Sequence, residues 1–278
     1  MIKLKFIFII ACFVFCSKQL FTQESYKLEY KFEKGKIYRY YENTLTDMIQ
    51  EMMGREMKIK SGTNSITRVV VDQVEKDDIY SLLVSADSLE VFSSTPMGDT
   101  TIVMNDVVGK RTRINMSKLG NILVRETIDT VKMMGRFSSG AQREGIKFPI
   151  LFEKSLKIGE TWNSKTIDTI KQMGGNIAVN SDYTYTLVGK EKINGSECLS
   201  VTFTGKYTLE GKTSRQGLEF YLDGSGKNNG KFYFDPKLGL VVEEETNSES
   251  EINLATTGEQ QMIIPISQTT KSIKKLIK

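Results

Sequence analysis

Histidine is absent from all 278 residues of the chain, and this bears first on catalysis. Histidine supplies the usual general base and the commonest metal ligand, so Ser-His and Cys-His arrangements are removed with it. Residues 205–213 resemble a phosphate-binding loop, but five residues rather than four separate the glycines and no helical pattern follows. The sequence therefore predicts no catalytic residue and no cofactor, and we expect a protein that is not an enzyme.

Oxygen-bearing side chains gather in two places where a metal ion could be held. Residues 223–230 are rich in Asp, Ser and Asn but lack the closing acidic residue of a calcium loop, so we interpret them as a hairpin tip. Four glutamates alternate along a strand that begins at Leu240, about 6.6 Å apart on one face, which is typical of a solvated surface. These are Glu243, Glu245, Glu249 and Glu251. Neither pattern predicts a metal site.

Cysteine chemistry is limited to one thiol of the mature chain. Cys12 and Cys16 lie in an N-terminal leader, which leaves Cys198. A reactive thiol needs a nearby cation or helix terminus that lowers its pKa, and the sequence around Cys198 supplies neither. We therefore expect a packed, unreactive cysteine and no intramolecular disulfide.

Methionine gives the only compositional indication of a ligand. All 12 methionines except Met1 follow the leader. Flexible thioethers suit irregular apolar surfaces, including lipid-binding cavities, and they also fill ordinary cores. The candidate residues for an apolar ligand surface are Met48, Met52, Met57, Met133 and Met134.

The elements that must position these residues are strands. Residues 26–32 alternate aromatic or apolar with charged side chains, as a strand with one buried and one wet face does. Asn194 with Gly195 and Met53 with Gly54 predict hairpin turns. The one helical pattern lies within residues 127–145, whose glycines indicate a helix followed by a loop. We predict an all-β protein of mainly antiparallel strands.

An internal repeat predicts how these strands are grouped. Lys118, Leu119 and Gly120 precede a Glu-Thr pair at 126–127, and the same pattern recurs at residues 237–246. Matching glycines, hairpin turns and Pro-Ile endings lie in the same order in both copies, which indicates duplication of one supersecondary unit. We expect a signal peptide at 1–22, a first β unit at 23–127, a connecting helix or loop at 128–147 and a second β unit at 148–278. The units are expected to form curved sheets or half-barrels.

Residues 1–22 have the features of an export signal. Two lysines precede an apolar run at residues 6–16, which suits a signal-peptide core and is shorter than the roughly 20 residues of a spanning helix. Cleavage before Ser17 and cleavage before Gln23 both stay open. The residues ending at Cys12 also resemble a bacterial lipobox, in which that cysteine would be lipidated. We expect an extracytoplasmic protein, periplasmic or secreted, without a transmembrane helix in the mature chain, and with a lipid anchor on Cys12 as the alternative.

Charge argues against nucleic acid as a partner. Residues 1–22 hold three of the 38 basic residues and none of the 34 acidic ones, which leaves 35 against 34. A near-neutral chain lacks the concentrated basic surface that nucleic acid requires. The one basic excess is C-terminal, and we interpret it as a solvated or frayed end, with contact to an anionic membrane surface as the alternative. Its residues are Lys271, Lys274, Lys275 and Lys278.

The order of these features resembles an uncharacterised family of exported β-rich proteins of Bacteroidota and related bacteria. The family carries a proline-containing segment that leads to a Gly-Asp/Glu-Ser/Thr-Trp motif, and Pro149 followed by residues 159–162 matches it. The resemblance implies a cell-envelope location and no established activity. At the level of the fold, curved exported sheets are also similar to lipoprotein-carrier and lipocalin-like half-barrels.

These observations lead to one predicted function and one alternative. Export, β repetition and methionine content predict a non-enzymatic envelope protein that binds an apolar small molecule or lipid on a concave β surface. The alternative is a structural or adhesive module whose sheet edges contact another envelope protein.

Overall fold

Long strands dominate the computed structural model of the protein. The structure describes residues 24–52, 54–129, 146–172, 175–215, 218–256 and 262–277. The first half of the chain forms β1 (Ser25–Tyr26), β2 (Ile37–Met52), β3 (Arg55–Val74), the short 3₁₀ helix η1 (Lys76–Asp78), β4 (Ile79–Thr95), β5 (Gly98–Val103), β6 (Thr112–Ser117) and β7 (Ile122–Thr127). The second half forms β8 (Leu156–Lys157), β9 (Thr161–Gln172), β10 (Gly175–Ile193), β11 (Ser196–Arg215), β12 (Leu218–Asp235), β13 (Leu240–Thr256) and β14 (Ile263–Ile277).

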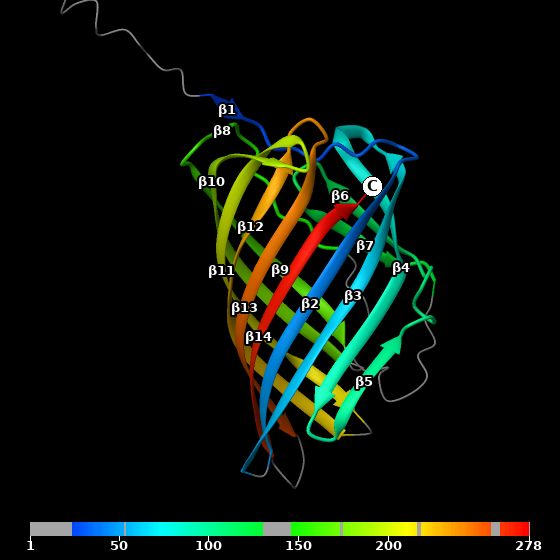
Figure 1. Ribbon diagram of the computed structural model, residues 1–278, viewed down its shortest axis with the longest axis vertical. Helices are drawn as coiled ribbons and strands as arrows, with labels where there is room; N and C mark the ends of the chain where they lie inside the picture. The colour runs from blue at the N-terminus through cyan, green and yellow to red at the C-terminus, as the bar shows by residue number, and fades with distance from the viewer. Residues whose placement is uncertain are drawn as a thin grey trace, which may run out of the picture.

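Twelve of these strands form one antiparallel sheet that curls on itself (Figure 1). Its order is β7-β6-β4-β3-β2-β14-β13-β12-β11-β10-β9, and β5 pairs with β4. β1 and β8 form a separate two-stranded pair. The predicted all-β class is confirmed, and the two predicted units share a single sheet. Most of the predicted connecting helix or loop at 128–147 cannot be compared, because residues 130–145 lie outside the described ranges. In those ranges, no helix is long and apolar enough to cross a membrane.

Two hairpin turns lie where the sequence predicts them. Gly54 joins β2 to β3 with a φ of 71°, and Asn194 with Gly195 joins β10 to β11 with φ values of 49° and 88°. Asn and Gly tolerate this left-handed conformation, which most side chains disfavour. The turn residues therefore set the ends of these strands.

Lys271, Lys274 and Lys275 are part of the sheet, so the predicted frayed end is wrong for these residues, and Lys278 lies outside the described ranges. β14 lies between β13 and β2, and its pairing with β2 runs from Ile266 opposite Gln50 to Ile277 opposite Arg39. Lys274 points inward and is 8 % exposed, and Lys275 pairs with Glu243 on the outer face at 3.1 Å. Composition predicted a solvated tail because it does not reveal that a strand has partners on both sides.

Residues 223–230 are strand rather than the predicted hairpin tip. They lie within β12 and pair with β11 and β13 along their whole length. Their glycines make room for the neighbouring strands: a Cβ atom on Gly226 or Gly230 would overlap an aromatic ring of β11. Glycine inside a strand often marks such a close approach.

The hydrophobic core lies at one end of the curled sheet and contains an extended N-terminal segment. Leu28, Tyr30 and Phe32 are at most 4 % exposed and pack among residues of both halves of the sheet. Residues 27–33 pair with no strand, although their alternation predicted one. The alternation correctly indicated which side chains are buried, and what they meet is the inner face of the sheet.

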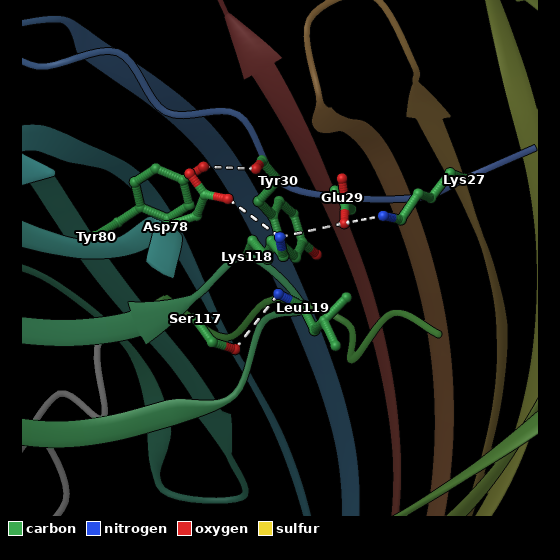
Figure 2. Close-up of polar contacts among 8 residues, drawn as sticks. All are labelled: Lys27, Glu29, Tyr30, Asp78, Tyr80, Ser117, Lys118 and Leu119. Carbon is green, nitrogen blue, oxygen red and sulfur yellow. Dashed lines mark hydrogen bonds and ion pairs between the residues drawn. The ribbon is translucent and has the colours of Figure 1, made fainter. Parts of the chain in front are cut away.

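Both copies of the Lys-Leu-Gly sequence hold this segment. The carbonyl of Lys118 accepts a hydrogen bond from the Tyr30 amide at 2.8 Å, and the carbonyl of Gly239 accepts one from the Lys31 amide at 3.0 Å. Figure 2 shows Lys118 between Glu29 and Asp78, at 3.5 and 3.1 Å. The two turns therefore accept hydrogen bonds from adjacent residues of the segment 27–33.

A substitution at Gly120 tests the contact between this turn and the segment 27–33. Its φ of 91° is unfavourable for other residues, and an added Cβ would lie 2.6 Å from the Pro149 carbonyl oxygen and 3.0 Å from the Tyr30 ring. We expect Gly120→Ala to lower the free energy of unfolding by about 2–4 kcal/mol, from backbone strain plus overpacking. Urea unfolding measures the loss. Gly109→Ala is the matched control, because Gly109 has a φ of 76° with open space around it and should lose only about 1–2 kcal/mol. Equal losses of unfolding free energy in the two variants would contradict a role of the Gly120 turn in holding residues 27–33 in place.

Candidate binding site

A cavity lies between the two edge strands of the sheet. β7 and β9 have no pairing with each other in the described ranges, and residues of both line a space of about 720 Å³. Residues 147–150, β10, Thr112, the turn residues Gly120 and Asn121, one residue of β11 and two residues of β13 complete the wall. Small-molecule sites usually measure about 300–1,000 Å³, so the cavity can hold a ligand of that class.

Arg125 is the charged residue of β7 that faces inward. It lies opposite Ile114, which is 1 % exposed in the core, and residues paired across two strands share one face of the sheet, so Arg125 lies on the inner face as well. Its Nε atom is buried and has no hydrogen-bond partner among the residues that the structure describes. A buried donor without a partner costs free energy, and such a group often meets a bound molecule.

A second cationic group carries its own counter-charge. Lys147 Nζ lies 3.7 Å from a carboxylate oxygen of Asp168, an inward residue of β9. The pair joins the segment 147–150 to the edge strand across the cavity wall. Because both residues are about half exposed, the pair contributes little to stability.

A buried ion pair lies deeper on the inner face. Lys274 is paired with Glu244, and their side chains are 10 % and 17 % exposed. Lys274 also donates a hydrogen bond of 2.8 Å to the Lys147 carbonyl, and its Nζ lies 5.9 Å from the centre of the Phe148 ring. Glu244 lines the cavity and is neutralised there by Lys274. Arg125 is therefore the lining cation that has no ion-pair partner in the ranges that the structure describes.

Aromatic rings form the wall that belongs to β10 and β11. Tyr183, Tyr185 and Phe203 line the cavity, and Tyr185 stacks on Trp162 with ring centres 5.0 Å apart. Burial raises the pKa of the Tyr183 hydroxyl, while the hydrogen bond from Asn228 acts in the opposite direction. Both tyrosines stay neutral near pH 7, so this wall adds no charge.

Hydroxyl and amide groups line much of the remaining inner face. One row across eight strands consists of paired inward residues, of which all but a glycine bear a hydroxyl or amide group. In register order they are Ser164, Tyr183, Gly205, Asn228, Ser248, Thr270, Thr46 and Ser61. Thr46 and Thr270 lie within hydrogen-bond distance at 3.0 Å, as do Tyr207 and Ser248 at 3.1 Å. Such a row prefers water or polar groups to hydrocarbon.

The methionines predicted as an apolar ligand surface are not brought together at this cavity. Met48 and Met57 are partly buried residues of β2 and β3, and neither lines the cavity. Met52 ends β2, and Met133 and Met134 lie outside the described ranges. The assignment of a ligand surface to these residues stays a prediction. Sequence reasoning missed Arg125, because only the register opposite Ile114 shows that it faces inward.

Cys198 and the alternating glutamates of β13 also lie within the described ranges. Cys198 is fully buried, and burial raises the pKa of its thiol to about 11, which confirms the expected packed cysteine. Glu245, Glu249 and Glu251 are exposed on the outer face of β13, as the alternation predicted. Across the ranges that the structure describes, no cluster of three or more His, Cys, Asp or Glu residues could hold a metal ion.

Comparison with known proteins finds similarity to solved structures alone. No protein-family model matches the chain, and no curated protein matches it. An outer membrane channel from Pseudomonas putida F1 matches with 8 % identity, 89 % of this chain and 97 % of that chain covered, and a TM-score of 0.26. OccK2 (OpdF) of Pseudomonas aeruginosa matches with 7 % identity, 87 % and 98 % coverage and a TM-score of 0.24. OccD3 (OpdP) of the same species matches with 5 % identity, 92 % and 94 % coverage and a TM-score of 0.25.

Two sequence-based predictions are corrected by these findings. The resemblance to a family of exported proteins and to lipoprotein carriers is wrong, since no family model matches the chain. The predicted apolar or lipidic ligand, with the adhesive module as its alternative, is wrong as well. Hydroxyl, amide and charged side chains occupy the inner face where an apolar surface was expected.

Removing one partner of the buried Lys274–Glu244 pair should destabilise the protein. Lys274→Met leaves Glu244 without its partner on the inner face, and we expect the free energy of unfolding to fall by about 3–5 kcal/mol. Lys275→Met is the control, because the Lys275–Glu243 pair faces outward and Lys275 is 45 % exposed, so its loss should be about 1 kcal/mol or less. Chemical denaturation of both variants measures the difference, and losses of similar size would show that the inner pair is well hydrated.

The Cys198 thiol should react slowly. A pKa of about 11 instead of 9 lowers the thiolate fraction about a hundredfold at pH 8, and burial blocks access further. We expect the native protein to react with a thiol-specific disulfide reagent at least a hundred times more slowly than the unfolded protein. Comparable rates before and after unfolding would contradict the packed position of this residue.

Proposed function

We propose that this protein acts outside the cytoplasm and binds a small organic anion in the cavity between β7 and β9. The observation that supports the proposal most directly is Arg125, an inward guanidinium whose buried Nε has no hydrogen-bond partner within the described part of the chain. An arginine fork matches the geometry of a carboxylate and can donate two parallel hydrogen bonds. A ligand carboxylate would satisfy the donor that the protein leaves unpaired.

The charges around the cavity favour an anion over a cation. Asp168 is already beside Lys147, and Glu244 is paired with Lys274. These two carboxylates are therefore compensated within the protein, while Arg125 has no ion-pair partner among the described residues. A cationic ligand would have to displace an existing ion pair, whereas an anionic ligand would complete one.

The outer face of the sheet favours a protein that is surrounded by water rather than by lipid. A row of exposed outward residues crosses eight strands there, and seven of the eight are charged. In register order they are Lys165, Asp182, Lys206, Lys227, Glu249, Thr269, Asp47 and Lys60. Charged residues on a lipid-facing strand cost about 2–4 kcal/mol each near the bilayer midplane. We therefore favour an extracytoplasmic binding protein over a membrane-embedded channel.

The export signal supports the proposed location. Two lysines followed by the apolar run at residues 6–16 are typical of a secretory leader. We propose that residues 1–22 direct the chain across the inner membrane, and that the repeat units 23–127 and 148–278 arose by duplication. Catalysis has no part in the proposal, since binding alone accounts for the unpaired arginine.

Calorimetry with small carboxylates and their neutral amides tests the proposal. We expect the wild-type protein to bind at least one carboxylate more tightly than its amide, and Arg125→Gln to weaken that carboxylate about 10- to 100-fold. The amide should be little affected, because it lacks the charge that Arg125 recognises.

Arg113→Gln is the matched control. Arg113 lies on the neighbouring strand β6, faces outward, and is paired with Glu126 at 3.4 Å and with Asp72 at 3.6 Å. Its loss should leave carboxylate binding unchanged. The proposal fails if no carboxylate binds, or if both arginine variants weaken binding equally.

A further inference from the structure

One ring of the cavity wall rests directly on a glycine of the next strand. Tyr183 of β10 lies opposite Gly205 of β11, and a Cβ atom added to Gly205 would overlap three carbons of the Tyr183 ring. The three atoms nearest to that Cβ all belong to this ring. The ring therefore occupies the space that a side chain at position 205 would fill, with one face against the backbone of β11.

The neighbouring rings define how Tyr183 is presented to the cavity. The Tyr185 ring lies 5.9 Å away at an interplanar angle of 27°, and the Phe203 ring lies 6.1 Å away at 68°. The Tyr183 and Tyr185 rings are thus nearly parallel, and the Phe203 ring stands edge-on to Tyr183. Tyr185 is 6 % exposed and Tyr183 is partly exposed, so Tyr183 is the ring that a ligand meets first.

The Tyr183 hydroxyl is held in place by the strand beyond Gly205. Asn228 of β12 donates a hydrogen bond to it, and Asn228 is itself paired with Gly205. The ring is thus fixed at its base by the strand β10, beneath its face by Gly205 and at its tip by Asn228. A ring fixed in this way is already positioned for stacking, because little side-chain freedom is lost when a ligand binds.

We propose that the ligand is a planar carboxylate, whose aromatic or heteroaromatic ring stacks on Tyr183 and whose carboxylate reaches Arg125. This inference rests on the proposed function, which requires only an anion. Both groups line the same cavity, on walls formed by different parts of the sheet. A flat ring fits against Tyr183 with its edge toward Phe203, while a puckered saturated ring of the same carbon number meets both with fewer close contacts.

Benzoate and cyclohexanecarboxylate are the probes, because they share the carboxylate and the number of ring carbons. We expect the wild-type protein to bind benzoate roughly two- to tenfold more tightly than cyclohexanecarboxylate by calorimetry. Gly205→Ala places a methyl group where the ring lies and should remove this preference, although position 205 carries no charge and is not among the lining residues. Tyr183→Leu should remove it as well, without altering the backbone of β11.

Two further variants separate stacking from other effects. Tyr183→Phe retains the ring and should retain the preference for benzoate. Tyr207→Leu removes another ring that lies on a glycine, Gly226, but is not among the lining residues, so it should leave both affinities unchanged. A preference that persists in Tyr183→Leu overturns the stacking role.

The outcomes for the two proposals are distinct. Equal affinity for the two acids in the wild-type protein overturns the planar-ligand inference while carboxylate binding through Arg125 still stands. Binding of other carboxylates without either probe also overturns the inference. If no carboxylate binds at all, the proposed function itself fails.

Discussion

The pairing of β14 with β2 is the contact on which the sheet depends. Every other neighbour within the two halves of the sheet comes from the same half of the chain, whereas β14 brings the C-terminal strand against the N-terminal one. The backbone hydrogen bonds of this pairing join two meanders into one sheet, and they place inward Lys274 between Glu42 and Glu244 on the adjacent strands. A lysine in that position supports the pairing because opposite charges face each other across both strand boundaries.

The register between strands also explains which features the sequence could predict. Alternation within a strand is local, so it predicted the all-β class, the buried Leu28, Tyr30 and Phe32, and the outward glutamates of β13. Turn chemistry is local as well, and Asn194 with Gly195 lies where it was expected. The partners of β14 depend on contacts across the whole chain, and no local pattern reveals them.

The candidate site is harder to predict for the same reason. Arg125 follows Ile122, Leu123 and Val124 in an edge strand, and nothing in that run shows which side faces inward. A register shift between Asn115 and Met116 changes the alternation at this point of the pairing with β6. Because a one-residue shift turns every following side chain to the opposite face, the direction of Arg125 follows from the bulge and not from composition. Met48 and Met57 do not line this cavity, and their assignment to a ligand surface stays a prediction.

The middle of the sheet carries polar residues on both faces, so burial of apolar side chains contributes little to stability there. The outer row from Lys165 to Lys60 is charged, and the inner row from Ser164 to Ser61 bears mainly hydroxyl and amide groups. Burial of apolar surface is therefore concentrated at the end of the sheet that holds residues 28–32, and the middle is held mainly by backbone hydrogen bonds. Glycines under aromatic rings, such as Gly205 under Tyr183, add contact where side-chain packing is otherwise sparse. The core and the polar wall meet at the cavity, because Tyr185 and Phe203 belong to the hydrophobic core and the partly exposed Tyr183 packs against it. The rings that stabilise this end of the sheet therefore also form the wall of the cavity that Arg125 lines.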